Sequence, residues 1–201
     1  MDQGGACAGM IRMNWNLSVI INITMAACAA GAVFFHMRKH PVRVVLRYFT
    51  VLSNILCSAA ALAVAVGRLR GSVPAFVLLL KYAGTSAVTV TLLTVLIFLG
   101  PNLGYKFLLT GPDLFLHLIC PVLAIVSFIA WDGLNMGFPV VFCGVLPVAA
   151  YTGLYFYKVM IAPAEKQWDD FYGFNKDGKW LLSGVVMLLG TFLISLALWR
   201  L

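Results

Sequence analysis

The chain has 201 residues, of which 62% are hydrophobic and only 10% are charged, and its mean hydropathy is +0.97. A soluble domain carries roughly 25% charged residues and a disordered chain has low hydrophobicity, so both classes are excluded. The 14 Lys and Arg exceed the 7 Asp and Glu by a net charge of +7, but they are spread over loops and form no basic tract of the kind that binds nucleic acid. The sequence therefore predicts an integral membrane protein without a nucleic-acid partner.

Six apolar stretches are each long enough to cross the bilayer as a helix. Strands are excluded because these stretches are continuously apolar instead of alternating. We expect one compact all-α domain over residues 1–201, a bundle of six transmembrane helices without a separate soluble domain. The first span lacks a following small-residue cleavage site, so we expect it to be retained. The predicted spans are residues 15–35, 48–66, 75–99, 114–131, 138–157 and 180–199.

The basic residues predict the orientation of these spans. Lys and Arg are enriched in cytoplasmic loops, and one face of the predicted bundle carries nine of them against five at the other. The richer face is therefore expected to be cytoplasmic, with both termini outside. Lys81, near the start of the third span, is expected to extend its amine to the interface. The nine are Arg38, Lys39, Arg43, Arg47, Lys106, Lys158, Lys166, Lys176 and Lys179, and the five are Arg12, Arg68, Arg70, Lys81 and Arg200.

The cysteines point to neither a disulfide framework nor a metal site. Their number is odd, and four of the five lie in apolar stretches without the spacing of metal ligands. We expect them to be small buried side chains, and we expect no cofactor. The five are Cys7, Cys28, Cys57, Cys120 and Cys143.

Two clusters of polar residues stand near the starts of even-numbered spans. Polar residues inside a bilayer are costly, so such clusters are candidates for function. Thr50, Ser53 and Asn54 follow at i, i+3 and i+4 on one face of the second span, and Asp113 and His117 are four residues apart in the fourth. Even-numbered spans enter from the same side of the membrane, so Thr50 and His117 are expected at similar depth.

A hydroxyl and an imidazole at one depth suit nucleophilic catalysis. Thr50 would attack as the nucleophile once His117 had taken its proton. Pro121 leaves the carbonyl of His117 without its helical partner, which bends the helix there and opens a cavity. Asn54 is a candidate oxyanion donor, and Asp113 is a candidate orienter of the imidazole.

Each of these residues also has a structural interpretation, which the sequence leaves open. An intramembrane threonine commonly bonds to a carbonyl of its own helix, and histidine or asparagine commonly joins neighbouring helices. Asp113 directly follows Pro112, as an N-terminal capping residue of a helix often does. His36 and His40 have the helical spacing of metal ligands but lie beside Pro41, so we expect a loop there. A lipid-binding or transport protein without enzymatic activity, or a purely structural bundle, would fit the same residues.

The starts of the second and fourth spans resemble a known family. The segment Arg47-Tyr48-Phe49-Thr50, together with His117 followed by Pro121, is similar to the transmembrane threonine hydrolases typified by the androgen-induced-gene protein and ADTRP. The longer pattern Tyr-Phe-Thr-x-x-Ser-Asn is closer to their bacterial six-helix relatives, and the animal proteins lack its Ser-Asn pair. The resemblance implies a bacterial plasma-membrane protein that hydrolyses fatty acid esters of hydroxy fatty acids, with Thr50 as nucleophile and His117 as its partner. Outside these motifs the chain matches in hydropathy and number of spans only.

A substrate of that class carries a free carboxylate, which needs a charged partner at the interface. If the second helix extends back past Pro41, Arg47 and Arg43 stand about one to two turns above Thr50 on the same face. They are therefore candidates to hold the carboxylate. Both arginines also fit the role of topology-setting charges near lipid phosphates.

The loop before the sixth span contains the aromatic residues Trp168, Phe171 and Tyr172. This loop is predicted on the same side of the membrane as Thr50 and His117, so it is a candidate lid that covers an acyl chain and excludes water. An interfacial loop, with aromatic rings at the membrane surface, is the alternative.

Overall fold

The conformation comes from a computed structural model, which describes residues 3–133 and 136–201. Across these residues the chain is helical without a strand, and six helices are long and apolar enough to cross a membrane. The protein is thus an integral multi-pass membrane protein, and the predicted all-α fold class is confirmed. The spans are Trp15–Lys39, Phe49–Leu69, Ala75–Asn102, Pro112–Asp132, Val140–Ile161 and Trp180–Arg200.

Three spans are single helices, namely α1 (Gln3–Lys39), α3 (Phe49–Leu69) and α10 (Trp180–Arg200). The other three pass from α-helix into π-helical turns, in which backbone bonds join residues five apart. The third span consists of α4 (Ala75–Leu93), η1 (Thr94–Leu99) and α5 (Gly100–Leu103). The fourth consists of α7 (Pro112–Leu114), η2 (Phe115–Ile119), α8 (Cys120–Ser127) and η3 (Phe128–Asp132). The fifth consists of α9 (Val140–Phe156) and η4 (Tyr157–Ile161). The loops contain α2 (Val42–Val45), α6 (Tyr105–Leu108), η5 (Ala164–Lys166) and η6 (Lys176–Gly178).

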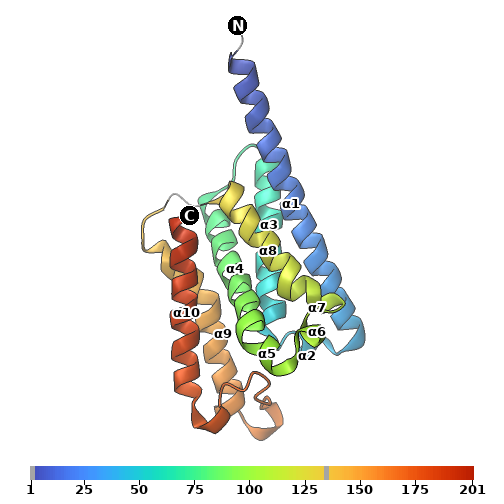
Figure 1. Cartoon of the computed structure of the whole chain (residues 1–201), viewed down its shortest axis with the longest axis vertical. Coiled ribbons are helices and arrows are strands. Elements are labelled where there is room, and N and C mark those ends of the chain that lie inside the picture. The colour runs from blue at the N-terminus through green and yellow to red at the C-terminus, as the bar shows by residue number, and fades with distance from the viewer. Residues whose placement is uncertain (1–2, 134–135) are drawn as a thin grey trace.

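The bundle is arranged around α4, which contacts α3, α8, α9 and α10. On one side α1 packs along α3 and also contacts α8, and on the other side α9 packs along α10. The α4 span is the most enclosed of the six and α10 the least. Figure 1 shows both chain ends at one end of the bundle and α2, α5, α6 and α7 at the other. The loop end therefore holds the starts of α3 and η2, where the candidate site residues lie.

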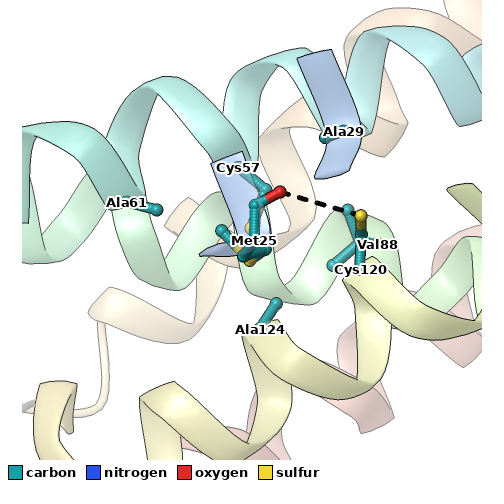
Figure 2. Close-up of a cluster of buried hydrophobic side chains, with 7 residues drawn as sticks. All are labelled: Met25, Ala29, Cys57, Ala61, Val88, Cys120 and Ala124. Carbon is teal, nitrogen blue, oxygen red and sulfur yellow. Dashed lines mark hydrogen bonds between the residues drawn. The ribbon is translucent and has the colours of Figure 1, made fainter. Parts of the chain in front are cut away.

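Small side chains let the central helices approach closely. Figure 2 shows the cluster where α1, α3, α4 and α8 meet, in which the thiol of Cys120 lies 3.8 Å from the carbonyl oxygen of Met25. A Cβ added at Gly84 of α4 would lie only 2.7 Å from the Cα of Cys57 of α3, so these two helices touch through their backbones. Because lipid tails are as apolar as the helix surfaces, the hydrophobic effect does not drive helices together in a bilayer. Close packing of this kind then helps to hold the bundle together. The cluster consists of Met25, Ala29, Cys57, Ala61, Val88, Cys120 and Ala124.

The cysteines follow the prediction in part. Cys57 and Cys120 are buried in this cluster, whereas Cys28 and Cys143 are only half-buried, and all four are free thiols. The side chain of Cys7 lies outside the part of the chain for which burial is described.

Candidate functional site

A cavity of about 380 Å³ opens at the loop end of the bundle, and Thr50 and His117 both line it. We call it the Thr50 cavity. Its wall is largely apolar, with Val51, Leu108 and Leu116 among its lining residues. The topology thus brings the predicted hydroxyl and imidazole to one space, which is large enough for part of a lipid. The other polar side chains on its wall are His36, His40, Tyr48, Asp113 and Tyr172.

The imidazole of His117 is oriented by a backbone carbonyl. Its Nδ1 lies 2.7 Å from the carbonyl oxygen of Leu108, and because a carbonyl can only accept, Nδ1 carries the hydrogen. Nε2 is then the nitrogen with the free lone pair, which is the basic tautomer for proton transfer. His117 lies in the π-helical turn η2, four residues before Pro121, whose missing N–H leaves the helix unable to continue regularly there.

Thr50 lies in the first turn of α3, which begins at Phe49 after an extended Tyr48. The N–H groups at a helix start carry partial positive charge. In α3 that of Phe49 donates to the hydroxyl of Tyr172, and those of Val51 and Leu52 donate to the carbonyl of Tyr48. The hydroxyl of Thr50 makes no hydrogen bond to any described residue, so it is not bonded back to its own helix. The hydroxyls of Thr89, Thr91 and Thr191, by contrast, donate to the carbonyl four residues earlier.

Asn54 holds the two halves of the site together through backbone bonds. Its Nδ2 donates to the carbonyl of Thr50 at 2.8 Å and to the carbonyl of Leu116 at 3.0 Å. This ties α3 to η2 at the level of Thr50 and His117. The side chain is buried, and its amide hydrogens are engaged by these carbonyls, so it does not offer them to the cavity.

Asp113 lines the cavity but contacts a different histidine from the one predicted. Its Oδ1 lies 3.1 Å from Nε2 of His36, a close contact without the alignment of a hydrogen bond. It sits inside the short helix α7, whose N-cap is Gly111, so it is not a capping residue either. The expected orienting role for His117 falls to the carbonyl of Leu108.

The predicted placement of Arg43 and Arg47 on one continuous helix is wrong. Arg43 belongs to the separate short helix α2, and α3 begins only at Phe49. The guanidinium of Arg47 lies over the ring of Trp168, 5.7 Å from its centroid, and its carbonyl accepts from the hydroxyl of Tyr151. Neither arginine is among the residues that line the Thr50 cavity, whereas His36 and His40 are.

The aromatic loop before α10 contributes two residues to the wall of the cavity. Phe171 and Tyr172 line it, and Trp168 packs against Phe171. The hydroxyl of Tyr172 accepts the N–H of Phe49 at 3.0 Å, which joins the loop to the first turn of α3. Burial raises the pKa of Tyr172 to about 12, so its hydroxyl stays protonated at neutral pH and keeps a hydrogen to donate.

The carboxylate of Asp170 anchors this loop. It accepts the hydroxyl of Tyr155 at 2.7 Å and the N–H groups of Phe174 and Asn175 at 3.0 and 2.8 Å. These bonds fix the turn that carries Phe171 and Tyr172 against α9. The loop therefore holds two aromatic rings on the wall of the Thr50 cavity.

A second polar cluster, which the sequence analysis missed, lies at the opposite end of the bundle. The carboxylate of Asp132 is buried and accepts from Ser18, Asn22, Ser127 and the guanidinium of Arg68, the last at 3.0 Å. We call it the Asp132 cluster. The signal in the sequence was the acidic residue at the end of the fourth span, since an intramembrane charge requires a partner.

Lys81 belongs to the edge of this cluster, and the expectation that it reaches the interface is wrong. Its side chain is 0% exposed, and its Nζ donates to Oδ1 of Asn22 at 2.7 Å. Asn22 in turn donates to Asp132 at 3.0 Å. The amide of Asn22 therefore links the amine of Lys81 to the carboxylate of Asp132.

Comparison of the chain with protein-family models, curated proteins and solved structures found no match. Among the described residues, no group of three His, Cys, Asp or Glu side chains is placed to hold a metal ion. The geometry of the Thr50 cavity is thus the main basis for assigning a function.

Proposed function

We propose that the protein is an intramembrane lipid ester hydrolase with Thr50 as its nucleophile and His117 as its general base. One observation carries this proposal: a threonine hydroxyl free of its own helix and a histidine held in its basic tautomer line the same cavity. Both groups belong to elements that Asn54 ties together. The residues also match the motifs of the transmembrane threonine hydrolases.

The chemistry follows from these atoms. Nε2 of His117 takes the proton of the Thr50 hydroxyl, directly or through one water, while Oγ1 bonds to the ester carbonyl carbon. The resulting oxyanion is stabilised by the partial positive charge at the start of α3. The ester C–O bond then breaks, and the alcohol leaves with the proton from His117. Water attacks the acyl-threonine in the same way, which releases the acid and restores the Thr50 hydroxyl.

The substrate class we propose is acyl esters of membrane lipids, including fatty acid esters of hydroxy fatty acids. The largely apolar wall of the Thr50 cavity suits acyl chains, and the aromatic cap of Phe171 and Tyr172 excludes water from them. A free carboxylate on such a substrate would meet His36 and His40 on that wall. We also propose that the cavity faces the cytoplasmic leaflet of a bacterial plasma membrane, with both termini outside, because the basic loops lie at the same end.

A fluorophosphonate probe on the purified protein tests the proposal. We expect covalent labelling that mass spectrometry maps to Thr50, that is lost in Thr50→Ala and that persists in Thr50→Ser. Ser53→Ala is a matched control, since Ser53 lies one turn further along α3 and is buried. Labelling that survives Thr50→Ala, or protein that stays unmodified at high probe excess, would overturn the nucleophile and favour a lipid-binding protein without enzymatic activity.

A further inference from the structure

A second hollow of about 540 Å³ lies on the other side of the wall formed by α1 and η2. We call it the α1 groove. From α1 it is lined by Ala27, Gly31, Phe35 and Lys39, and it is closed by Pro112 and Phe115 at the start of the fourth span. It faces outward from the bundle, so in a membrane its contents come from the bilayer.

The groove has the length of one lipid leaflet. From Ala27 to Lys39 the helix rises by about 18 Å, at about 1.5 Å per residue. Half of the hydrocarbon core is about 15 Å thick, so the groove reaches from the interface to about the bilayer centre. At Gly31 an added Cβ would meet nothing within 4 Å, so the space beside this residue is open. The groove therefore matches one acyl chain in length.

The chemistry of the lining changes along this length. Its inner part is apolar, formed by Ala27, Gly31 and Phe115, whereas its outer end carries the exposed cation Lys39. Arg38 lies beside Lys39 at the end of the same helix. This pattern complements an acyl chain that bears an anionic headgroup, because the chain replaces lipid along the apolar part while the charge meets the ammonium at the interface.

The groove and the Thr50 cavity share one wall. Phe115 lines the groove and its neighbours Leu116 and His117 line the cavity, while on α1 Phe35 lines the groove and His36 the cavity. Adjacent residues of α1 and of η2 thus line the two hollows. The contact of 3.1 Å between His36 and Asp113 joins α1 to α7 at this shared wall.

We propose that the α1 groove binds one acyl chain of an anionic membrane lipid and delivers it to the Thr50 cavity between α1 and α7. The binding site stands on the groove itself, and the delivery step rests on the proposed hydrolase. Separation of His36 from Asp113 opens the boundary between α1 and α7, since both side chains are partly exposed, at 23% and 36%, and a contact between partly exposed groups contributes little stability.

Binding is tested without turnover, with a fatty acid that carries a photoactivatable diazirine in mid-chain. The purified full chain is placed in phosphatidylcholine nanodiscs, irradiated and mapped by mass spectrometry. We expect adducts in segments 27–39 and 111–115. Gly31→Leu should reduce the adducts about tenfold, because the leucine side chain fills the groove. Lys39→Gln should reduce the adducts of the fatty acid about tenfold, which is the loss expected for a charge-assisted hydrogen bond. It should not reduce those of the matching fatty alcohol.

Gly190→Leu is the matched control, because Gly190 of α10 is also helical and has nothing within 4 Å of an added Cβ. It should leave the adducts unchanged. The binding site would be overturned if adducts formed equally on α9 and α10, or if Gly31→Leu left the adduct yield as unchanged as Gly190→Leu does. Either result would mean that the probe reacts from the lipid that surrounds the whole bundle.

Delivery is tested by chain length. Gly31→Leu should lower kcat/KM about tenfold for a long-chain ester and leave it unchanged for a water-soluble acetate ester, which enters the cavity from the loop end. If Gly31→Leu has the same kcat/KM as the unsubstituted protein on the long-chain ester and also on the acetate ester, the delivery step is overturned. The proposed binding site is not affected by that result. Adducts in the groove of a protein that hydrolyses neither ester would overturn the hydrolase and with it the delivery step.

Discussion

At His117 a neutral backbone carbonyl occupies the place that a carboxylate has in a Ser-His-Asp triad. The bond from Nδ1 to the oxygen of Leu108 at 2.7 Å selects the tautomer, as the aspartate of a triad does. A carbonyl carries no net charge, so it stabilises the imidazolium formed during proton transfer less than a carboxylate would. In the proposed site the carbonyl of Leu108 therefore orients the imidazole of His117 but stabilises its positive charge only weakly.

The central pair leads to a first prediction. Thr50→Ala and His117→Ala should each reduce kcat about 10⁴-fold or more, and the double variant should be no slower than either, because the two groups act as one unit. Thr50→Ala should change the free energy of unfolding by less than about 1 kcal/mol, and His117→Ala should cost about 1 kcal/mol through its lost bond to Leu108. Ester turnover and thermal unfolding in detergent measure both effects. Full turnover in Thr50→Ala would reassign the nucleophile.

The Asp132 cluster leads to a second prediction, about stability. Asp132→Ala leaves the guanidinium of Arg68 without its buried partner, so it should cost about 3–5 kcal/mol in the free energy of unfolding. Lys179→Ala is the control, since Lys179 and Asp177 form an exposed pair at 3.8 Å and the variant should lose less than about 1 kcal/mol. Denaturant titration in detergent compares the two. Similar losses in both variants would mean that the cluster is hydrated in the folded protein.

Among the helices, the site depends on where α3 begins and where η2 departs from a regular helix. The extended Tyr48 ends the turn after α2 and places Thr50 in a first turn, where the partial charge of the helix favours an anion. On the facing side, the π-helical turn before Pro121 carries both Leu116 and His117. Asn54 donates to a carbonyl of α3 and to a carbonyl of η2, so the start of α3 and the π-helical turn are held at a fixed position relative to each other.

The irregular turn leads to a third prediction. Pro121→Ala restores an N–H that can bond to the carbonyl of His117, which lets α8 extend regularly through η2 and turns the imidazole away from Leu108. We expect kcat to fall about tenfold or more, as displacement of a catalytic group by about 1 Å does, while stability is retained. Pro147→Ala is the control, because Pro147 lies inside α9 and lines neither the Thr50 cavity nor the groove. Kinetics and thermal unfolding distinguish the two, and unchanged kcat in Pro121→Ala would contradict this account.

Across the whole molecule, the two polar clusters lie at opposite ends of an apolar bundle. The Thr50 cavity opens among the basic loops, whereas the Asp132 cluster ties α1, α3, α4 and the end of the fourth span together near the chain ends. Between them, the small residues shown in Figure 2 pack the central helices tightly. One end is therefore hollow and the other is cross-linked by hydrogen bonds and charges.

The excess of basic residues at the loop end leads to a fourth prediction. In intact cells, the thiol of Arg43→Cys should be shielded from a membrane-impermeant maleimide, while Gly5→Cys in a Cys7→Ala background should react. Permeabilised cells provide the control, since both cysteines should then be labelled. The reverse pattern in intact cells would place the Thr50 cavity in the outer leaflet.

The fold class and the span pattern of this protein could be predicted from local features of its sequence. Long apolar runs are a local property, and a bilayer accepts them only as helices, so the spans follow within a few residues. Because successive spans alternate in direction, residues early in the second and fourth spans must also share an end of the bundle. The depth of Thr50 and His117 could therefore be predicted without knowledge of which helices are neighbours.

Which polar groups contact one another depends on how the whole bundle packs. Asp113 turns to His36, His117 is held by Leu108, and Lys81 is buried against Asn22. Each of these contacts joins segments whose rotation and neighbours are set by side-chain packing of the whole bundle. In lipid that packing has no hydrophobic drive toward one arrangement, so small residues and interhelical hydrogen bonds select it, and no local pattern in the sequence encodes the outcome.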